Sequence, residues 1–288
     1  MALKRGDQGV EVRDLQLKLL ALGYHLPRFG ADGDLGDETL EAISAFRVDH
    51  ALTSTTDDFT STVPLKVLKA IQDAFATLAT RAVVTAPEDH TTKHAGGQWR
   101  SRDQRPLRSI TGITLHQTAV LFGETPSRWY TLAAHLGITR GGGAYLICPL
   151  DRIVWHGNGL NTTDVGIEID GYFEGIEGKP STFWKPPTDL TRQPLQLTPE
   201  QVSATRAIIK WICGEVKTDG GEVQFIHAHR QASKDRESDP GSRVWKEVGL
   251  WAQSDLGLSD GGKNFTRGTG LKIPEAWDPS RVGIPYRS

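Results

Sequence analysis

Apolar residues recur at helical spacing through the N-terminal part of the chain. Over residues 10–22 they stand three or four positions apart, and Gly23 follows where such a helix ends. A loop rich in Gly and Asp, residues 30–36, leads to a second amphipathic stretch, and Pro64 takes the favoured first position of a third. The three apolar faces are Val12, Leu15, Leu19 and Leu22, then Leu40, Ile43 and Phe46, then Leu65, Leu68, Ile71, Phe75 and Leu78. This pattern predicts a small all-α domain of three helices over residues 1–79.

Short β-branched, apolar runs alternate with longer helical stretches after residue 108. The expected strands are 109–116, 144–148, 152–155, 165–170 and 223–227, and the expected helices are 126–136 and 198–216. The second of these helices opens with a capping box, Thr198-Pro-Glu-Gln201. Strands that alternate with long helices predict an α/β domain, with a mixed central sheet covered by helices, over residues 109–255.

Two further stretches show no hydrophobic period. Residues 80–108 are polar and contain Pro87, Gly96 and Gly97, which is typical of a linker or an exposed loop. Residues 256–288 are rich in glycine, and we expect this irregular C-terminal tail to wrap the surface.

Composition narrows the classes of partner. The chain has 288 residues, 38% of them hydrophobic, which suits a globular protein of one large or two smaller domains. A net charge of -2 gives no general attraction to phosphate, so nucleic acid is not expected as the main partner. No segment suits a bilayer span or a cleaved signal peptide, which predicts synthesis in the cytoplasm without a cleavable signal and no membrane association. Cys148 and Cys213 are expected to be buried free thiols, and no oligomerisation signal is present, so a monomer is expected.

The segment 225–241 carries the first candidate for chemistry. It places His229 and Asp239 on either side of a loop that a proline and a glycine close. His116, at the end of a predicted strand, is the candidate for a third ligand, and two imidazoles with one carboxylate form a zinc set that leaves one tetrahedral position for water. A core histidine and an aspartate that caps the next helix would give the same pattern. His227 lies on the same side of an extended strand as His229, so the chemistry alone leaves both open.

Two carboxylates on a central predicted strand are candidates for moving the proton of an attacking water. Glu168 and Asp170 stand two residues apart, so both face the same side of a strand and either could serve. A strand-edge carboxylate in water, or a structural ion pair, is the alternative explanation for Glu168.

The stretch LKRGDQGVEVRDLQLKLLALGY, followed by ADGDLGDETLEAISAFRVDHAL, resembles the peptidoglycan-binding domain type 1 repeat. The shared features are the turn at 6–9, the helix start at 12–16, the Asp-Gly loop at 32–36 and the pair Ala45-Phe46. Arg47 stands where the family usually has Gln. The resemblance implies a three-helix domain that binds bacterial peptidoglycan through its glycan strand and stem peptide.

Residues from about 112 to 241 resemble the zinc-dependent N-acetylmuramoyl-L-alanine amidases of type 2, whose relatives include phage amidases and peptidoglycan recognition proteins. Four stretches occur in the family's order: LHQTA, GAYLICPLDRIVWHG, DVGIEIDG and HRQASKDRESDPG. The resemblance implies zinc ligands at His116, His229 and Asp239, a catalytic carboxylate at Glu168, and a position close to the substrate at His156.

One position departs from this family's pattern. Some members place a lysine two residues before the third ligand, where it stabilises the oxyanion, whereas Glu237 stands here. A carboxylate cannot stabilise negative charge, so the zinc ion itself, Lys234 or Arg236 are the candidates for that role.

The resemblance implies an enzyme that hydrolyses the amide between N-acetylmuramic acid and L-alanine through a zinc-activated water, as a bacteriolytic phage endolysin does. A cellular or secreted-effector amidase is the alternative within this class. A non-catalytic peptidoglycan-recognition protein and a metallopeptidase that cuts elsewhere in the stem peptide are alternatives from other classes. The presence of all three candidate ligands and of Glu168 argues against the non-catalytic protein.

Overall fold

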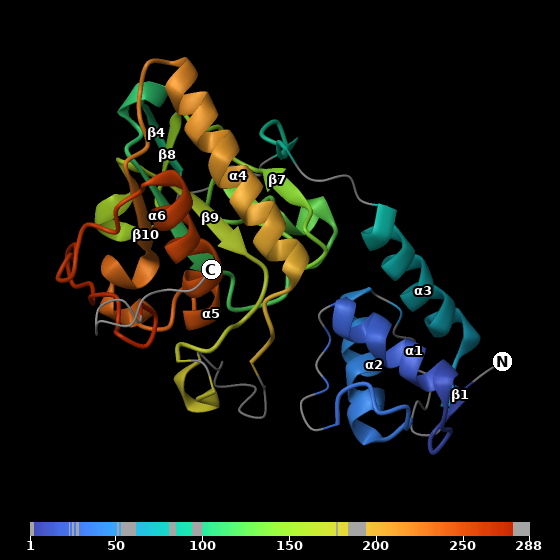
Figure 1. The fold of residues 1–288 in the computed structure, drawn as a ribbon. Coiled ribbons are helices and arrows are strands. Elements are labelled where there is room, and N and C mark those ends of the chain that lie inside the picture. The colour runs from blue at the N-terminus through green and yellow to red at the C-terminus, as the bar shows by residue number, and fades with distance from the viewer. Residues whose placement is uncertain are drawn as a thin grey trace. The chain divides into compact units, whose positions relative to one another are not determined.

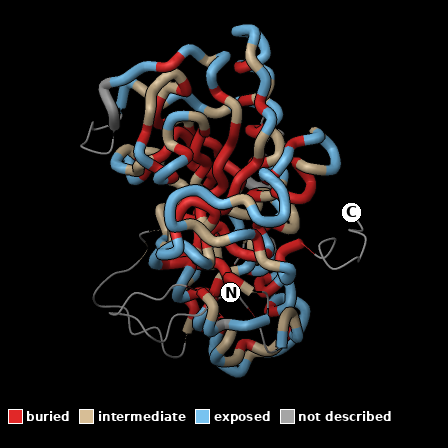
Figure 2. Tube along the Cα trace, turned by 90° about the vertical axis from the view of Figure 1, so that its left-hand side faces the viewer, coloured by how far each residue is buried: buried red, intermediate tan, exposed pale blue. Residues whose placement is uncertain are grey.

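The computed structural model describes residues 3–22, 24, 26, 29–50, 52, 62–80, 85–93, 100–176, 178–183 and 194–278. The chain forms two compact units, Met1–Ala82 and Val83–Ser288, and their elements are labelled in Figure 1. Within them the buried stretches of the chain lie inside, and the exposed stretches are mostly loops and outer helix faces (Figure 2).

Three helices form most of the first unit: α1 Val10–Ala21, α2 Asp37–Asp49 and α3 Leu65–Thr80. Their buried apolar side chains, together with those of the pair β1 Leu3–Lys4 and β2 Thr62–Val63, form one core. Gln16 fixes the loop before α2, because its Nε2 donates to Asp32 Oδ1 at 2.8 Å and its Oε1 accepts from the Gly33 amide at 2.7 Å. Leu65, predicted for the apolar face of the third helix, is exposed instead.

The second unit is built on a mixed six-stranded sheet, as predicted. The strand order is β10-β5-β9-β6-β7-β3. The first four run parallel to one another, β7 is antiparallel to β6, and β3 is parallel to β7. The bounds are β3 Glu88–Asp89, β5 Gly112–Gln117, β6 Leu136–Ile138, β7 Ala144–Leu146, β9 Asp164–Ile169 and β10 Phe225–Ala228. A separate antiparallel pair joins β4 Arg100–Gln104 to β8 Arg152–Val154.

The register gives the sheet two faces of opposite character. Side chains alternate along each strand, so Ile113 and Leu115 share a face with Val165 and Ile167 of the neighbouring strand. This apolar face packs with the long helix α4 Pro199–Thr218, which lies across the strands in Figure 1. The other face presents Thr114, His116, Asp164 and Glu168. The predicted capping box starts α4: the Gln201 amide donates to Thr198 Oγ1 at 3.1 Å, and the Thr198 amide donates to Gln201 Oε1 at 3.2 Å.

The helix predicted at 126–136 is wrong. A short 3-10 turn, Pro126–Trp129, occupies its start, and its last residue opens strand β6. Trp129 is fully buried, and a Cβ at Gly137 would lie only 2.1 Å from the indole. The indole Nε1 also donates to the Gly123 carbonyl at 2.9 Å. Packing of this one side chain against the sheet therefore outweighs the local apolar spacing.

The two stretches without a period both take part in the packing. Within 80–108, β3 extends the main sheet and β4 pairs with β8. After the helical segments α5 Ser242–Val244, Trp245–Gly249 and α6 Leu250–Leu256, the described part of the tail, up to residue 278, lacks helices and strands, as expected. The expected surface position of the tail is corrected, because Leu258, Ile273 and Trp277 are buried in the main core.

Both cysteines are free, as predicted. Cys148 is buried, as expected, whereas Cys213 is only partly buried. Among the helices that the structure describes, none combines the length and apolar character needed to cross a bilayer.

Candidate metal centre and active site

His116, His229 and Asp239 meet at the carboxyl end of β5 and β10. His116 is in β5, His229 begins the 3-10 turn that directly follows β10, and Asp239 lies in the loop before α5. The two histidine Nδ1 atoms are 2.9 Å apart, and Asp239 Oδ2 lies 3.0 Å from His229 Nδ1 and 4.0 Å from His116 Nδ1. All three residues are buried. The structure thus brings together the three candidate ligands that the sequence predicted.

The spacing of these atoms suits a small divalent cation. Zinc bonds of ~2.0–2.2 Å at tetrahedral angles separate neighbouring ligand atoms by roughly 3.3 Å, and the three separations of 2.9, 3.0 and 4.0 Å bracket that value. Burial, and then the neighbouring His229 and His156, hold the pKa of His116 well below its ordinary 6.5. Its imidazole is therefore neutral, as a metal ligand must be.

Gln117, the last residue of β5, ties the third ligand to the strand that carries the first. Its amide donates to Asp239 Oδ1 at 2.9 Å, which leaves Oδ2 toward the two imidazoles. Its side chain donates to the Ser238 carbonyl at 2.6 Å and accepts from the Phe173 amide at 2.5 Å. The carboxylate is therefore oriented before any ion binds.

His156 lies directly behind His116. His116 Nε2 is 3.0 Å from His156 Nδ1, and His156 Nε2 is 3.3 Å from the Asp164 carbonyl. If His116 binds a metal through Nδ1, its Nε2–H donates to His156, whose own Nε2–H donates to Asp164, and both tautomers are fixed. Residue 166 must be glycine here, because a Cβ would lie 2.6 Å from the His156 ring. His156 also lines the neighbouring cavity, so the predicted substrate contact stays a prediction.

The buried state of His156 predicts a pH effect on the metal-free protein. Burial lowers its pKa from 6.5 to about 4, against the opposing charge of Asp164. As the pH falls, the imidazole of residue 156 is protonated in the unfolded chain before it is protonated in the folded chain. The folded state therefore keeps its full stability above about pH 6.5 and loses about 3 kcal/mol of it as the pH falls toward 4. Denaturant unfolding of wild type and His156→Gln across this range should show wild type losing more stability on acidification. A constant difference between the two would contradict this state of His156.

The neighbouring His227 belongs to a different cluster. Its Nδ1 lies 2.7 Å from Asp164 Oδ2, and its ring is stacked between Phe225 and Phe265. β10 ends at Ala228, so the backbone turns between the two histidines and directs His229 alone to His116 and Asp239.

This separation gives a test of the ligand assignment. In His229→Ala we expect zinc per chain to fall to a small fraction of the wild-type content, because one of three ligands is removed. In His227→Ala we expect zinc content near that of wild type, with circular dichroism to confirm folding of both variants. Normal zinc in His229→Ala would refute the assignment.

A cavity of about 220 Å³ is lined by His229 and Asp239, and Glu168 lines it as well. Glu168 is the register partner of His116 on the adjacent parallel strand, so both side chains emerge from the same face of the sheet. Its Oε2 is buried and has no hydrogen-bond partner among the described residues. Burial, and then the charge of Asp239, raise the pKa of Glu168 well above its ordinary value, while Arg236 opposes this. A carboxyl group in this environment suits proton transfer at near-neutral pH.

Asp170, the alternative carboxylate, is engaged elsewhere. It accepts the amides of Phe122 and Gly123 at 2.7 and 2.8 Å and so holds the loop that follows β5. Burial raises its pKa to about 7 although these two amides lower it. Asp170 is absent from the residues that line the cavity, so the geometry favours Glu168.

Arg236 and Lys234, the two basic candidates for stabilising the oxyanion, also differ in their position relative to the cavity. Arg236 lines the cavity and is exposed at its edge, whereas Lys234 does not line it. Glu237 is exposed, and its carbonyl accepts from the guanidinium of Arg230. Asp235, which the sequence did not single out, also lines the cavity.

Asp164 was not predicted from the sequence, although its hydrogen bonds hold residues next to the site in place. It accepts from Thr114 Oγ1 at 2.7 Å and Thr163 Oγ1 at 2.8 Å, and it contacts His227. Arg105 donates to its carbonyl at 2.8 Å, and burial lowers the pKa of Arg105 to about 10. The available signal was the spacing of Asp164 and Glu168, four residues apart and therefore on the same face of one strand.

The C-terminal tail closes over the turn that carries His229. The amides of Arg267 and Leu271 donate to the carbonyls of Gln231 and Arg230, each at 2.7 Å. Arg230 in turn donates to the Lys272 carbonyl at 3.1 Å and lies over the Trp277 ring, 4.9 Å from its centroid. The tail therefore holds the backbone of the two residues that directly follow His229.

Two imidazoles, a carboxylate and a nearby proton-accepting Glu at the end of a mixed sheet form a site suited to metal-assisted hydrolysis. Residues 105–242 match the family described as N-acetylmuramoyl-L-alanine amidase, and this range contains all four of these residues. This part of the chain is thus similar to N-acetylmuramoyl-L-alanine amidases.

Two curated relatives come from Bacillus licheniformis. A probable N-acetylmuramoyl-L-alanine amidase is 51% identical over 41 residues, which is 14% of this chain and 12% of the relative. The N-acetylmuramoyl-L-alanine amidase CwlL is 44% identical over 45 residues, 16% of this chain and 12% of the relative. The chain therefore spans only about an eighth of the length of the curated relatives it matches.

Solved structures align over a larger share of the chain at lower identity. The endolysin amidase LysCS from Clostridium intestinale URNW is 15% identical with a TM-score of 0.39, over 62% of this chain and 99% of that one. The Ph2119 endolysin from a Thermus scotoductus bacteriophage is 18% identical with a TM-score of 0.36, over 58% of this chain and 97% of that one.

Proposed function

We propose that the chain is a zinc-dependent amidase that cleaves the bond between N-acetylmuramic acid and L-alanine in bacterial peptidoglycan. The convergence of His116, His229 and Asp239 beside the unpartnered carboxylate oxygen of Glu168 carries this proposal. Two imidazoles and one carboxylate are a donor set that zinc accepts in hydrolytic enzymes, and three protein ligands leave a position for water or substrate.

Zinc, when bound, would lower the pKa of a water molecule toward about 7 and polarise the carbonyl of the scissile amide. Glu168 then accepts the proton of the attacking water and donates it to the amino group of the leaving L-alanine. Burial and the charge of Asp239 raise its pKa above the ordinary value, which favours the protonated carboxyl group that the second step requires. Arg236, at the edge of the same cavity, stabilises the negative charge that develops on the carbonyl oxygen.

The role of Arg236 has a matched control in the same loop. Arg236→Ala is expected to lower kcat by roughly 10-fold or more while zinc content stays near that of wild type, since the guanidinium acts on the transition state and not on the metal. Lys234→Ala removes a positive charge outside the cavity and should have a much smaller effect. An unchanged rate in Arg236→Ala would remove this residue from the mechanism.

The first unit supplies a second activity in this proposal. We infer that its three helices bind the wall and keep the catalytic unit near a polymeric substrate, so that modest affinity is enough. A phage-type endolysin that acts on the wall after release, as a monomer, combines these two parts.

Digestion of purified cell walls tests the proposal. We expect release of stem peptide that chelation abolishes and added zinc restores. A non-catalytic recognition protein would instead sediment with walls and release nothing, and that result would refute the enzyme.

A further inference from the structure

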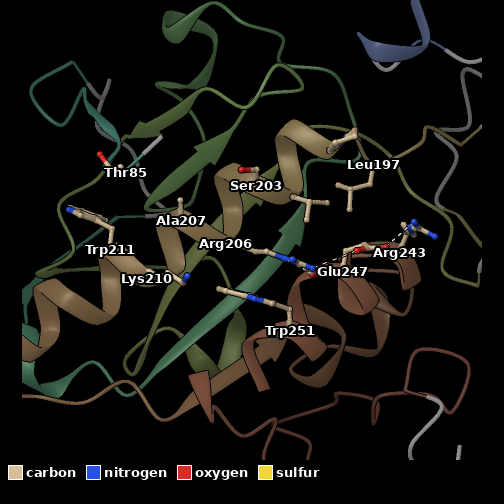
Figure 3. A pocket seen from close by; sticks show the side chains of 12 residues that line it. Thr85, Leu197, Ser203, Arg206, Ala207, Lys210, Trp211, Arg243, Glu247 and Trp251 are labelled. Atoms are coloured by element: carbon tan, nitrogen blue, oxygen red, sulfur yellow. Dashed lines mark hydrogen bonds and ion pairs between the residues drawn. The ribbon is translucent and has the colours of Figure 1, made fainter. Parts of the chain in front are cut away.

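A second cavity, of about 950 Å³, lies along one side of α4 (Figure 3). It shares no lining residue with the cavity beside Glu168. We call it the α4 groove; its lining residues on α4 recur at helical spacing, and the remainder come mainly from 243–251. Figure 3 shows Arg206 and Lys210 of α4 pointing toward Glu247 and Trp251, whereas Trp211 points to the other side of the helix, toward Thr85.

The charges that line the α4 groove are unbalanced. Arg206, Lys210 and Arg243 face a single lining carboxylate, Glu247, which leaves an excess of two positive charges. Both arginines share this carboxylate, at 3.6 Å from Arg206 Nη2 and 2.8 Å from Arg243 Nη2. Among the described residues, Lys210 has no carboxylate and no hydrogen-bond partner, and it is exposed.

Lys210 and Arg206 are held close together. They stand one helical turn apart, a spacing at which like charges repel. Both lie over the indole of Trp251, 5.5 and 5.2 Å from the ring centroid, which offsets part of that repulsion. A bound anion would offset the rest, so this end of the groove is suited to a negatively charged group.

The remaining lining favours a ligand with apolar faces as well as charge. Leu197, Val202 and the partly buried Trp211 supply apolar walls. The volume is at the upper end of the ~300–1,000 Å³ that is usual for small-molecule sites, so it accepts a few linked rings and not a flat protein surface. Sugar rings combine apolar C–H faces, which pack on indoles, with polar edges.

We propose that the α4 groove binds an anionic glycan, namely the peptide-free strand that the amidase reaction leaves. This inference rests on the proposed function. Hydrolysis adds water across the amide: the carbonyl carbon gains the hydroxyl and becomes a lactyl carboxylate, and L-alanine departs with a free amino group. The glycan product therefore gains one negative charge at each N-acetylmuramic acid, whereas the released peptide gains an amine that the cationic groove repels.

The consequence is retention of the enzyme on its product strand. Lys210 and Arg243 pair with lactyl carboxylates while the sugar rings pack against the apolar wall. The catalytic unit then stays beside the peptides that the same strand still carries, so successive cleavages occur on one strand.

Binding to peptide-free glycan strands, measured by calorimetry on the full chain after chelation, tests the proposal. Lys210→Glu should weaken binding by about 10-fold, and the loss should shrink at high salt. Lys217→Glu makes the same charge change at an exposed position of α4 outside the groove, and binding should stay near the wild-type value. Ser203→Trp, at an exposed lining position, should block the groove without altering charge.

Uncharged chitin oligosaccharides separate charge from stacking. They share the N-acetylated sugar rings but lack lactyl carboxylates, so we expect much weaker binding and no dependence on residue 210. Equal affinities for Lys210→Glu and Lys217→Glu, or equal binding of chitin and the anionic strand, would overturn the inference. Wall digestion by the same variants with zinc restored keeps the two proposals apart, because stem-peptide release together with unchanged glycan binding in Lys210→Glu rejects only the groove.

Discussion

Glu168→Gln is expected to lower kcat by roughly 10²–10⁴-fold while zinc per chain stays near one wild-type equivalent. Glutamine keeps the size of the side chain but cannot take a proton from water or give one to the leaving amine. Glu168 is not one of the three converging ligands, so metal binding should survive. Parallel measurements of zinc content and of stem-peptide release separate the two properties.

Asp170→Asn is the matched control for this variant. It makes the same chemical change two residues further along the chain, at a carboxylate that holds the amides of Phe122 and Gly123. We expect a lower melting temperature and a kcat near that of wild type. Equal losses of kcat in the two variants, or loss of zinc in Glu168→Gln, would show that Glu168 has a structural role only.

A chain that ends at Leu256 is expected to lose most of its bound zinc and to unfold more readily. The missing residues include Trp277, which is fully buried, and removal of a buried aromatic side chain alone costs about 3–5 kcal/mol. They also include the amides of Arg267 and Leu271, which hold the two residues of the turn that directly follow His229. Both losses act on the backbone that positions the second ligand.

A chain that ends at Asp278 is the control, because every tail contact described above lies before that residue. It should keep its zinc content, and thermal unfolding with metal analysis distinguishes the two truncations. Wild-type zinc stoichiometry in the chain that ends at Leu256 would show that the tail does not support the site.

Local patterns in the sequence were enough to predict α1 to α4 and most of the sheet, but not the helical segments at 242–256. The apolar period predicted α1 and α4 to within about two residues at each end, and the capping box at Thr198 predicted where α4 begins. These features depend on neighbours a few positions apart, so a single sequence contains them. The apolar spacing wrongly predicted a helix at 126–136, because there Trp129 packs on Gly137 of the sheet and this tertiary contact decides the structure.

The site required information about contacts between distant residues. Alternation along a strand places His227 and His229 on one side, and only the end of β10 at Ala228 separates them. The contact between His116 and His156 joins residues forty positions apart. The tail has no period at all, yet Trp277 donates a hydrogen bond to the Gly175 carbonyl. Such contacts are set by tertiary packing, which leaves little trace in local sequence.

Mass analysis of cell walls digested by the purified chain tests the central claim most directly. We expect glycan strands with free lactyl carboxylates together with intact stem peptides that begin at L-alanine. Both products should disappear after chelation and return with zinc. Fragments cut within the stem peptide or between sugars, or intact walls in the presence of zinc, would contradict the account.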